Sequence, residues 1–129
     1  MPLVATDAIV LHAFDYSETS RILRLATRET GVVSVLARGA RRSTKRFGSA
    51  LDLFAEGTVQ ILVREHRDLH TLCSFDLNRS RPALATDLGR FAGASALAEL
   101  VLRFATEEPQ VPIFDALSRS LDDLCAAEP

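Results

Sequence analysis

A run of cationic side chains is the part of this sequence with the clearest capacity for chemistry. In the segment "LARGARRSTKRFG", from Leu36 to Gly48, five of the nine residues between Arg38 and Arg46 are cationic and none is acidic. The five cations of this basic segment are Arg38, Arg41, Arg42, Lys45 and Arg46. A solvated surface normally mixes both signs, because like charges along one segment repel each other. The run therefore predicts a polyanionic partner, and a nucleic-acid backbone is the natural one.

The composition of the basic segment favours binding of phosphate groups. Arginine outnumbers lysine four to one, and a guanidinium fork suits bidentate contact with phosphate oxygens. Gly39 and Gly48 bracket the cations and permit close approach of a ligand to the backbone. Phe47 adjoins them, either as a base-stacking side chain or, as is commoner for phenylalanine, as part of the core.

Other arginines and other partners also fit the pattern. Arg21 and Arg24 precede the basic segment and could extend the same cationic track. Arg64 and Arg67 could do so too, but acidic neighbours favour local solvation for them. Two alternatives remain: a surface loop whose cations only keep the protein soluble, and a protein-interaction module whose basic loop binds an acidic peptide tail.

Catalytic and metal-binding patterns are absent from the sequence. It has no glycine-rich phosphate loop before a helix, no GxSxG, and no paired carboxylates beside a candidate base. His66 and His70 are four residues apart, but an intervening turn would point them in different directions, and Cys73 and Cys125 have no ligand-like neighbours. We therefore expect no enzyme, no metal site and no cofactor.

Length and composition indicate one small core with two differently charged parts. The chain has 129 residues, 47% of them hydrophobic, and a formal net charge of −2. Residues 1–80 carry 11 basic and 9 acidic residues, whereas residues 81–129 carry 4 and 8. We expect a domain boundary at this point, near Pro82, with residues 1–80 as the DNA-binding domain and 81–129 as a helical segment. No apolar run could span a bilayer and no secretion signal is visible, so a cytoplasmic protein is expected.

Short apolar runs with a period of two predict five strands in the first part of the chain. The predicted strands are Ala8 to Phe14, Ser20 to Thr27, Val32 to Ala37, Thr58 to Arg64, and Leu69 to Leu77. An open sheet of this size would leave its edges exposed, and closure into a barrel removes them. A five-stranded OB-fold barrel fits best, although strand count alone also admits an SH3-like barrel or a small sandwich.

Beyond Pro82 the apolar period changes to three and four residues, which predicts helices. The first should begin near Thr86 or Asp87 and run to about Thr106, with Pro112 opening the second. The expected apolar stripe of the first is Leu84, Leu88, Phe91, Ala94 or Ser95, Ala98, Val101, and Phe104 or Ala105. That of the second is Ile113 or Phe114, Leu117, Leu121 and Leu124.

Several of these motifs occur together in one order. The stretch from Ala8 to Phe54 resembles the N-terminal region of the RecO family of bacterial recombination mediators: a strand runs into "DYSE", and "SRIL", "TRETG", "ARGARR" and "RFGSALDLF" follow. The likeness covers about the first 80 residues, and the two predicted helices resemble the start of the family's helical C-terminal region. Family members are about twice as long, and many carry a zinc ribbon of paired CxxC motifs that this chain lacks.

The resemblance implies an OB fold that binds single- and double-stranded DNA and promotes annealing in DNA repair and recombination. The implied partners are RecR and single-stranded-DNA-binding protein, with the RecA recombinase loaded indirectly. By this likeness Arg38, Arg41 and Arg42 fall on the segment tied to DNA contact. Lys45 and Arg46 are added from their charge, and Arg21 and Arg24 as an extension of the track.

Overall fold

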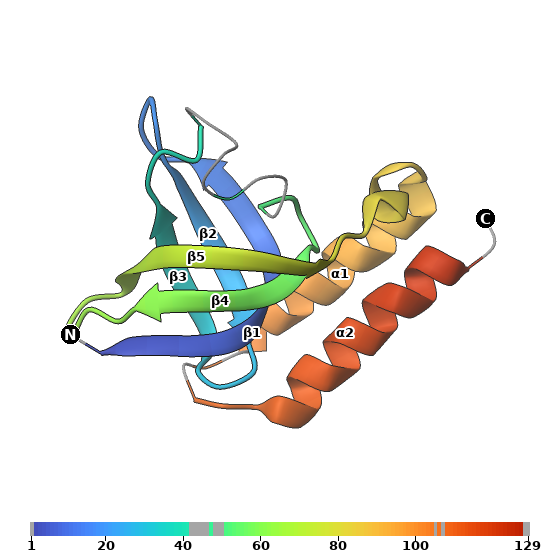
Figure 1. The fold of residues 1–129 in the computed structure, drawn as a ribbon. Helices are drawn as coiled ribbons and strands as arrows, with labels where there is room; N and C mark the ends of the chain where they lie inside the picture. The colour runs from blue at the N-terminus through green and yellow to red at the C-terminus, as the bar shows by residue number, and fades with distance from the viewer. Residues whose placement is uncertain (1, 42–46, 48–50, 105, 107, 128–129) are drawn as a thin grey trace.

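In a computed structural model, the chain forms five strands followed by two helices (Figure 1). The structure describes residues 2–41, 47, 51–104, 106 and 108–127. The elements are β1 (Leu3–Asp15), β2 (Arg21–Thr27), β3 (Gly31–Ala37), β4 (Glu56–Leu62), β5 (Leu69–Arg79), a 3-10 turn (Pro82–Ala85), α1 (Leu88–Phe104) and α2 (Val111–Ala126). All five predicted strands and both predicted helices are therefore confirmed. The main difference is at β1, which begins five residues earlier than predicted.

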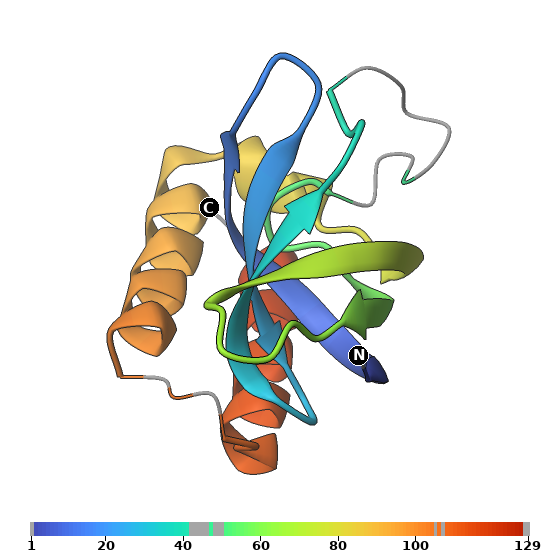
Figure 2. The same cartoon turned by 90° about the vertical axis from the view of Figure 1, so that its left-hand side faces the viewer.

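The strands form the closed barrel expected for an OB fold, in the order β1, β2, β3, β5, β4. β1 has two partners: its first half pairs with β4 and its second half with β2, both antiparallel. β3 and β5 close the circle as a short parallel pair (Figure 2). The early start of β1 follows from this closure, because residues 3–7 are held by β4 and not by a local hairpin.

Alternating side chains of the strands fill the barrel interior. Leu23 and Leu25 of β2 lie beside Val35 and Val33 of the neighbouring β3, and all four are buried. The connection between β3 and β4 adds Phe47, which is 5% exposed. Phe47 is therefore a core residue and not a base-stacking one.

A second apolar cluster lies between the outside of the barrel and the helices. Along β1, Val10 faces the interior, whereas Ile9 and Leu11 join the outer cluster. The strand is irregular between Val10 and His12, and after this bulge His12 points outward as Leu11 does. On α2, Phe114, Leu117 and Leu121 are buried as predicted. The outer cluster contains Ile9, Leu11, Ala26, Val32, Phe54, Leu84, Ala94, Ala98, Phe114, Leu117 and Leu121.

One buried arginine joins the barrel to α2. The side chain of Arg81 is 1% exposed, and its Nη2 donates to Glu56 Oε1 at 2.8 Å while its Nη1 donates to the Phe54 carbonyl at 2.7 Å. Its Nε donates to Asp122 Oδ1 at 3.0 Å, and Nη2 also lies 3.3 Å from both Oγ and the carbonyl oxygen of Ser118. Because every nitrogen of the guanidinium has an acceptor, its burial is compensated.

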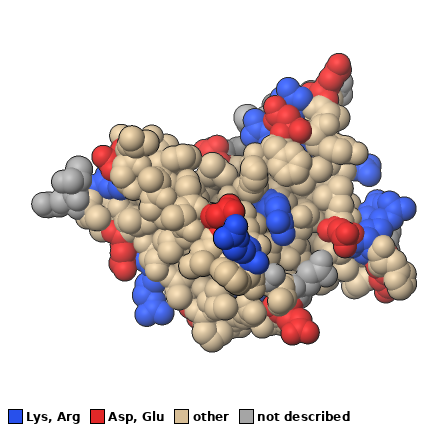
Figure 3. Space-filling view, turned by 180° about the vertical axis from the view of Figure 1, so that it is seen from behind, with Lys and Arg blue, Asp and Glu red and all other residues tan. Residues whose placement is uncertain are grey.

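The predicted apolar stripe of α1 is only partly buried. Asp87 caps the N-terminus of α1, because its Oδ2 accepts a hydrogen bond from the Arg90 N–H at 2.9 Å. Ala94 and Ala98 are buried, whereas Leu88 is 84% exposed and Phe104 is 70% exposed, so the barrel and α2 cover only part of the expected stripe. Apolar residues lie on more than one side of α1, and a broad uncharged area covers the helical side of the molecule (Figure 3).

No helix among the described residues is long and apolar enough to cross a membrane. Within the same residues, no group of three or more His, Cys, Asp or Glu side chains could hold a metal ion. Cys73 and Cys125 are both free and half-buried.

Gly57 is expected to tolerate no side chain. A Cβ at this position of β4 would lie 2.3 Å from the carbonyl oxygen of Asp76 and 2.6 Å from Cε1 of Phe75. The strands would have to separate, so Gly57→Ala should lower the free energy of unfolding by about 1–3 kcal/mol in urea denaturation. Gly89→Ala is the control, because its Cβ would meet only the Asp87 carboxylate at 3.2 Å and alanine favours helix. Equal losses in the two variants would contradict the prediction.

Candidate nucleic-acid interface

The structure describes four of the seven predicted DNA-binding cations: Arg21, Arg24, Arg38 and Arg41. Arg42, Lys45 and Arg46 lie outside the described residues. Arg38 follows the last residue of β3 and is exposed. Gly39 has a φ of 77°, so the chain turns directly after Arg38 in a conformation that glycine adopts without strain.

Arg21, Arg41 and Asp15 meet at the end of the barrel where β1 and β2 are joined. Arg21 Nε lies 3.3 Å from Asp15 Oδ1, and Arg41 Nε lies 3.4 Å from Asp15 Oδ2. Arg41 also donates from its backbone to the Thr19 carbonyl at 3.1 Å and from Nη1 to the Ser17 carbonyl. The start of the basic segment is therefore fixed against the β1–β2 hairpin, so two of the predicted cations converge.

One carboxylate partly neutralises this group. The side chains remain 36% exposed for Arg41, 40% for Arg21 and 56% for Asp15. Exposed ion pairs of this kind contribute about 0–1 kcal/mol to stability. The two arginines could therefore leave Asp15 at little cost and bind phosphate oxygens instead. Two guanidinium groups share the Asp15 carboxylate, and Glu18 of the same turn is a second exposed carboxylate.

The β1–β2 connection is the turn that "DYSE" predicted. Ser17 Oγ accepts from the backbone N–H groups of Thr19 and Ser20 at 3.3 and 3.2 Å, and the Tyr16 N–H donates to the Ser20 carbonyl at 3.0 Å. This bonding fixes the turn beside Arg21 and Arg41. The Tyr16 side chain stays 59% exposed.

Arg24 lies apart from that group, on the outer surface of β2. Its neighbours Leu23 and Leu25 are interior, so Arg24 faces outward between its cross-strand partners His12 and Ser34. Its Nε is shielded from solvent, with no hydrogen-bond partner among the described residues. Arg21 and Arg24 point to different sides of β2, and the extension of the cationic track through both of them stays a prediction.

Two aromatic side chains near Arg24 were missed by the sequence reasoning. The rings of His12 and Phe14 lie with centroids 5.5 Å apart at an angle of 55°, His12 is exposed, and Phe14 is 45% exposed. Residues two apart on a strand share a face, so the spacing of His12 and Phe14 was the available signal.

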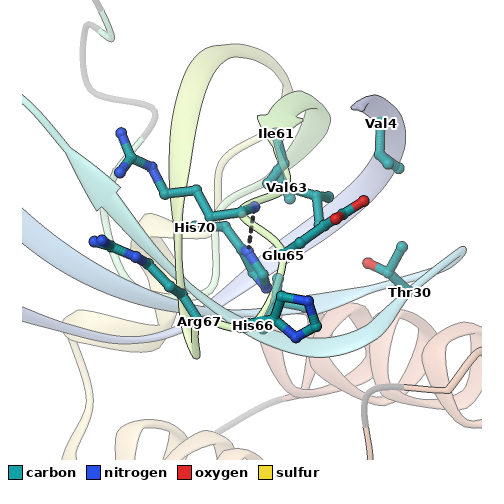
Figure 4. A pocket seen from close by; sticks show the side chains of 10 residues that line it. Val4, Thr30, Ile61, Val63, Glu65, His66, Arg67 and His70 are labelled. Atoms are coloured by element: carbon teal, nitrogen blue, oxygen red, sulfur yellow. Dashed lines mark hydrogen bonds between the residues drawn. The ribbon is translucent and has the colours of Figure 1, made fainter. Parts of the chain in front are cut away.

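The loop between β4 and β5 borders a pocket of about 290 Å³ at the other end of the barrel (Figure 4). Val4, Ile61 and Val63 give it apolar walls, and the His70 ring is buried with Nδ1 accepting from the Arg64 N–H at 3.0 Å. The Arg67 and Glu65 side chains point away from each other in Figure 4.

Basic and acidic residues alternate on the face seen in Figure 3 and form no single large basic patch there. Among the described cations, Arg21, Arg41 and Arg38 lie near one another at the end of the barrel where β1 and β2 are joined.

Comparison with known proteins agrees with the fold. The family model "Recombination protein O N terminal" matches residues 1–81, and "Recombination protein O C terminal" matches residues 85–129. A protein named DNA repair protein RecO from Anaeromyxobacter dehalogenans (strain 2CP-C) is 41% identical over 130 residues, covering 100% of this chain and 51% of the relative. One of the same name from Geobacter metallireducens is 39% identical, covering 100% of this chain and 52% of the relative. The chain thus spans about half the length of the curated relatives it matches.

Proposed function

Because the chain belongs to the recombination protein O (RecO) family, we propose that it is a DNA-binding recombination mediator in DNA repair. In this proposal it is not an enzyme: it binds single- and double-stranded DNA through residues 1–80, promotes annealing, and assists loading of a recombinase. RecR and single-stranded-DNA-binding protein are its proposed protein partners, and the RecA recombinase is affected indirectly. The names of the relatives support a role in repair.

The observation that carries the proposal is the convergence of Arg21 and Arg41 at one end of a closed OB barrel, next to exposed Arg38. Barrels of this type bind nucleic acids along a strand surface bordered by loops. The two arginines already hold a carboxylate, Asp15, at a distance suited to exchange with another anion. Phosphate oxygens fit these guanidinium groups at least as well as a carboxylate does.

The same ion pairs keep a second candidate open, which is an acidic peptide tail in place of DNA. A cluster that holds one carboxylate can hold others. The two functions differ in their response to salt, because a DNA backbone releases condensed counterions and a short peptide has few to release.

A titration at several salt concentrations tests the proposal. The chain is mixed with a labelled oligonucleotide or with a labelled acidic peptide, and binding is followed by fluorescence anisotropy. We expect the logarithm of the DNA binding constant to fall with the logarithm of salt by about 0.7 to 0.9 for each phosphate contact, independently of base sequence. Weak DNA binding with a flat salt dependence, together with tight peptide binding, would favour the acidic-peptide function.

A further inference from the structure

One part of the outer barrel surface is left uncovered by the helices. The helices cover Ile9, Leu11, Ala26 and Val32. Farther along the same strands, two cross-strand rows face outward, because the residues between them point into the core. The rows are His12, Arg24 and Ser34, and then Phe14, Ile22 and Leu36. We call these six residues the open face.

The open face carries two aromatic rings that are in contact and have exposed surface. Phe14 is 45% exposed, and its contact with His12, at a centroid distance of 5.5 Å, orients the two rings relative to each other. Tyr16, just beyond on the hairpin, is 59% exposed. Single exposed apolar side chains are ordinary, but two exposed rings in contact with each other indicate a binding surface.

The charge of the open face complements a polyanion. None of its six residues is acidic, and Arg24 lies in the middle row. Among the described residues no carboxylate pairs with Arg24, and its Nε has no hydrogen-bond acceptor. The group formed by Arg21 and Arg41 lies beyond the open face, at the end where β1 and β2 are joined, and supplies further cations near its border.

We propose that the open face is a subsite for unpaired nucleobases, which stack on Phe14 and His12 while Arg24 holds an adjacent phosphate. This inference rests on the proposed DNA binding and adds to it a selection for single strands. Only unpaired bases can offer their flat faces to a protein ring, because in a duplex those faces are covered by neighbouring base pairs. Base–aromatic stacking is sequence-tolerant and adds to the electrostatic attraction of the backbone.

Replacement of Phe14 by alanine tests the subsite. We expect Phe14→Ala to weaken binding of a single-stranded oligonucleotide about fivefold to a hundredfold, with duplex affinity unchanged. The salt slope should stay the same, because stacking releases no counterions. Phe14→Trp should bind single strands at least as well as the unchanged chain. Ile113→Ala is the matched control, since Ile113 is 48% exposed but lies on α2 and should affect neither substrate.

An abasic oligonucleotide gives an independent measurement with the unchanged chain. It keeps the phosphates and lacks the bases, so it should bind as weakly as the ordinary strand binds to Phe14→Ala. Thermal unfolding of each variant verifies that the fold is kept. The subsite alone would be overturned if Phe14→Ala bound single strands as tightly as the unchanged chain does. It would also be overturned if Phe14→Ala lost as much affinity for the duplex as for single strands. No DNA binding by the unchanged chain would overturn the proposed function as well.

Discussion

Replacing Arg81 with methionine is expected to lower the free energy of unfolding by about 3–5 kcal/mol. The change removes the partner of Glu56, whose side chain is 15% exposed, and the hydrogen bond to the Phe54 carbonyl. Leaving one member of a buried ion pair without its partner is costly, because the remaining charge cannot recover its hydration. For a domain of this size such a loss is a large part of total stability. Urea denaturation followed by far-UV circular dichroism measures it.

Arg79 provides the matched control. It also pairs with Asp122, but its side chain is 48% exposed, so Arg79→Met should change stability by less than about 1 kcal/mol. Combining Arg81→Met with Glu56→Met should recover part of the loss, since no charge is then left buried without a partner. A loss below about 1 kcal/mol in the Arg81 variant would show that the cluster does not hold the helices to the barrel.

Removing Arg38, Arg41 and Arg42 together is expected to weaken DNA binding for all base sequences alike. Alanine at the three positions should reduce the steepness of the salt dependence by up to about three units, roughly one for each lost phosphate contact. Folding should change little, because exposed arginines contribute within about 0.5 kcal/mol each. Anisotropy titrations with two unrelated oligonucleotides measure both quantities.

Two comparisons separate local contact from net charge. The variant Arg79→Ala, Arg103→Ala, Arg119→Ala loses the same charge near or on the helices and should bind DNA with almost unchanged affinity. Asp15→Asn should strengthen binding, because it removes the carboxylate that competes for Arg21 and Arg41. If both triple variants lose affinity equally, the effect is one of overall charge and the basic segment is not the contact. A loss confined to one oligonucleotide would indicate base readout instead.

The regular parts of the fold followed from local patterns. Leu23 and Leu25 flank Arg24, and Val33 and Val35 flank Ser34, so a period of two was sufficient to place strands and infer closure. The turn at Ser17 likewise depends on hydrogen bonds between near neighbours. Such features are set within a few residues and are visible in a single sequence.

Features that depend on distant partners were not predictable in the same way. Arg81 stands in "NRSRPA", which looks like a polar linker, and its burial requires Glu56, 25 residues away, and Asp122, 41 residues away. The bulge beside Leu11 depends on how β1 fits both β2 and the helices. The candidate interface shows the same limit: the cations were visible in sequence, whereas the position of Asp15 between Arg21 and Arg41 was not.

The way the helices cover the barrel bears on any attempt to isolate the barrel alone. A polypeptide shortened to residues 1–80 would expose an apolar strip to water, made of Ile9, Leu11, Ala26 and Val32. Glu56 would also lose its ion-pair partner, Arg81. Such a fragment would self-associate through this apolar strip. In a gel-shift experiment, the self-association could be mistaken for cooperative DNA binding. Polar substitutions at Leu11 and Val32 would be needed before spectroscopy on the shortened molecule could be interpreted.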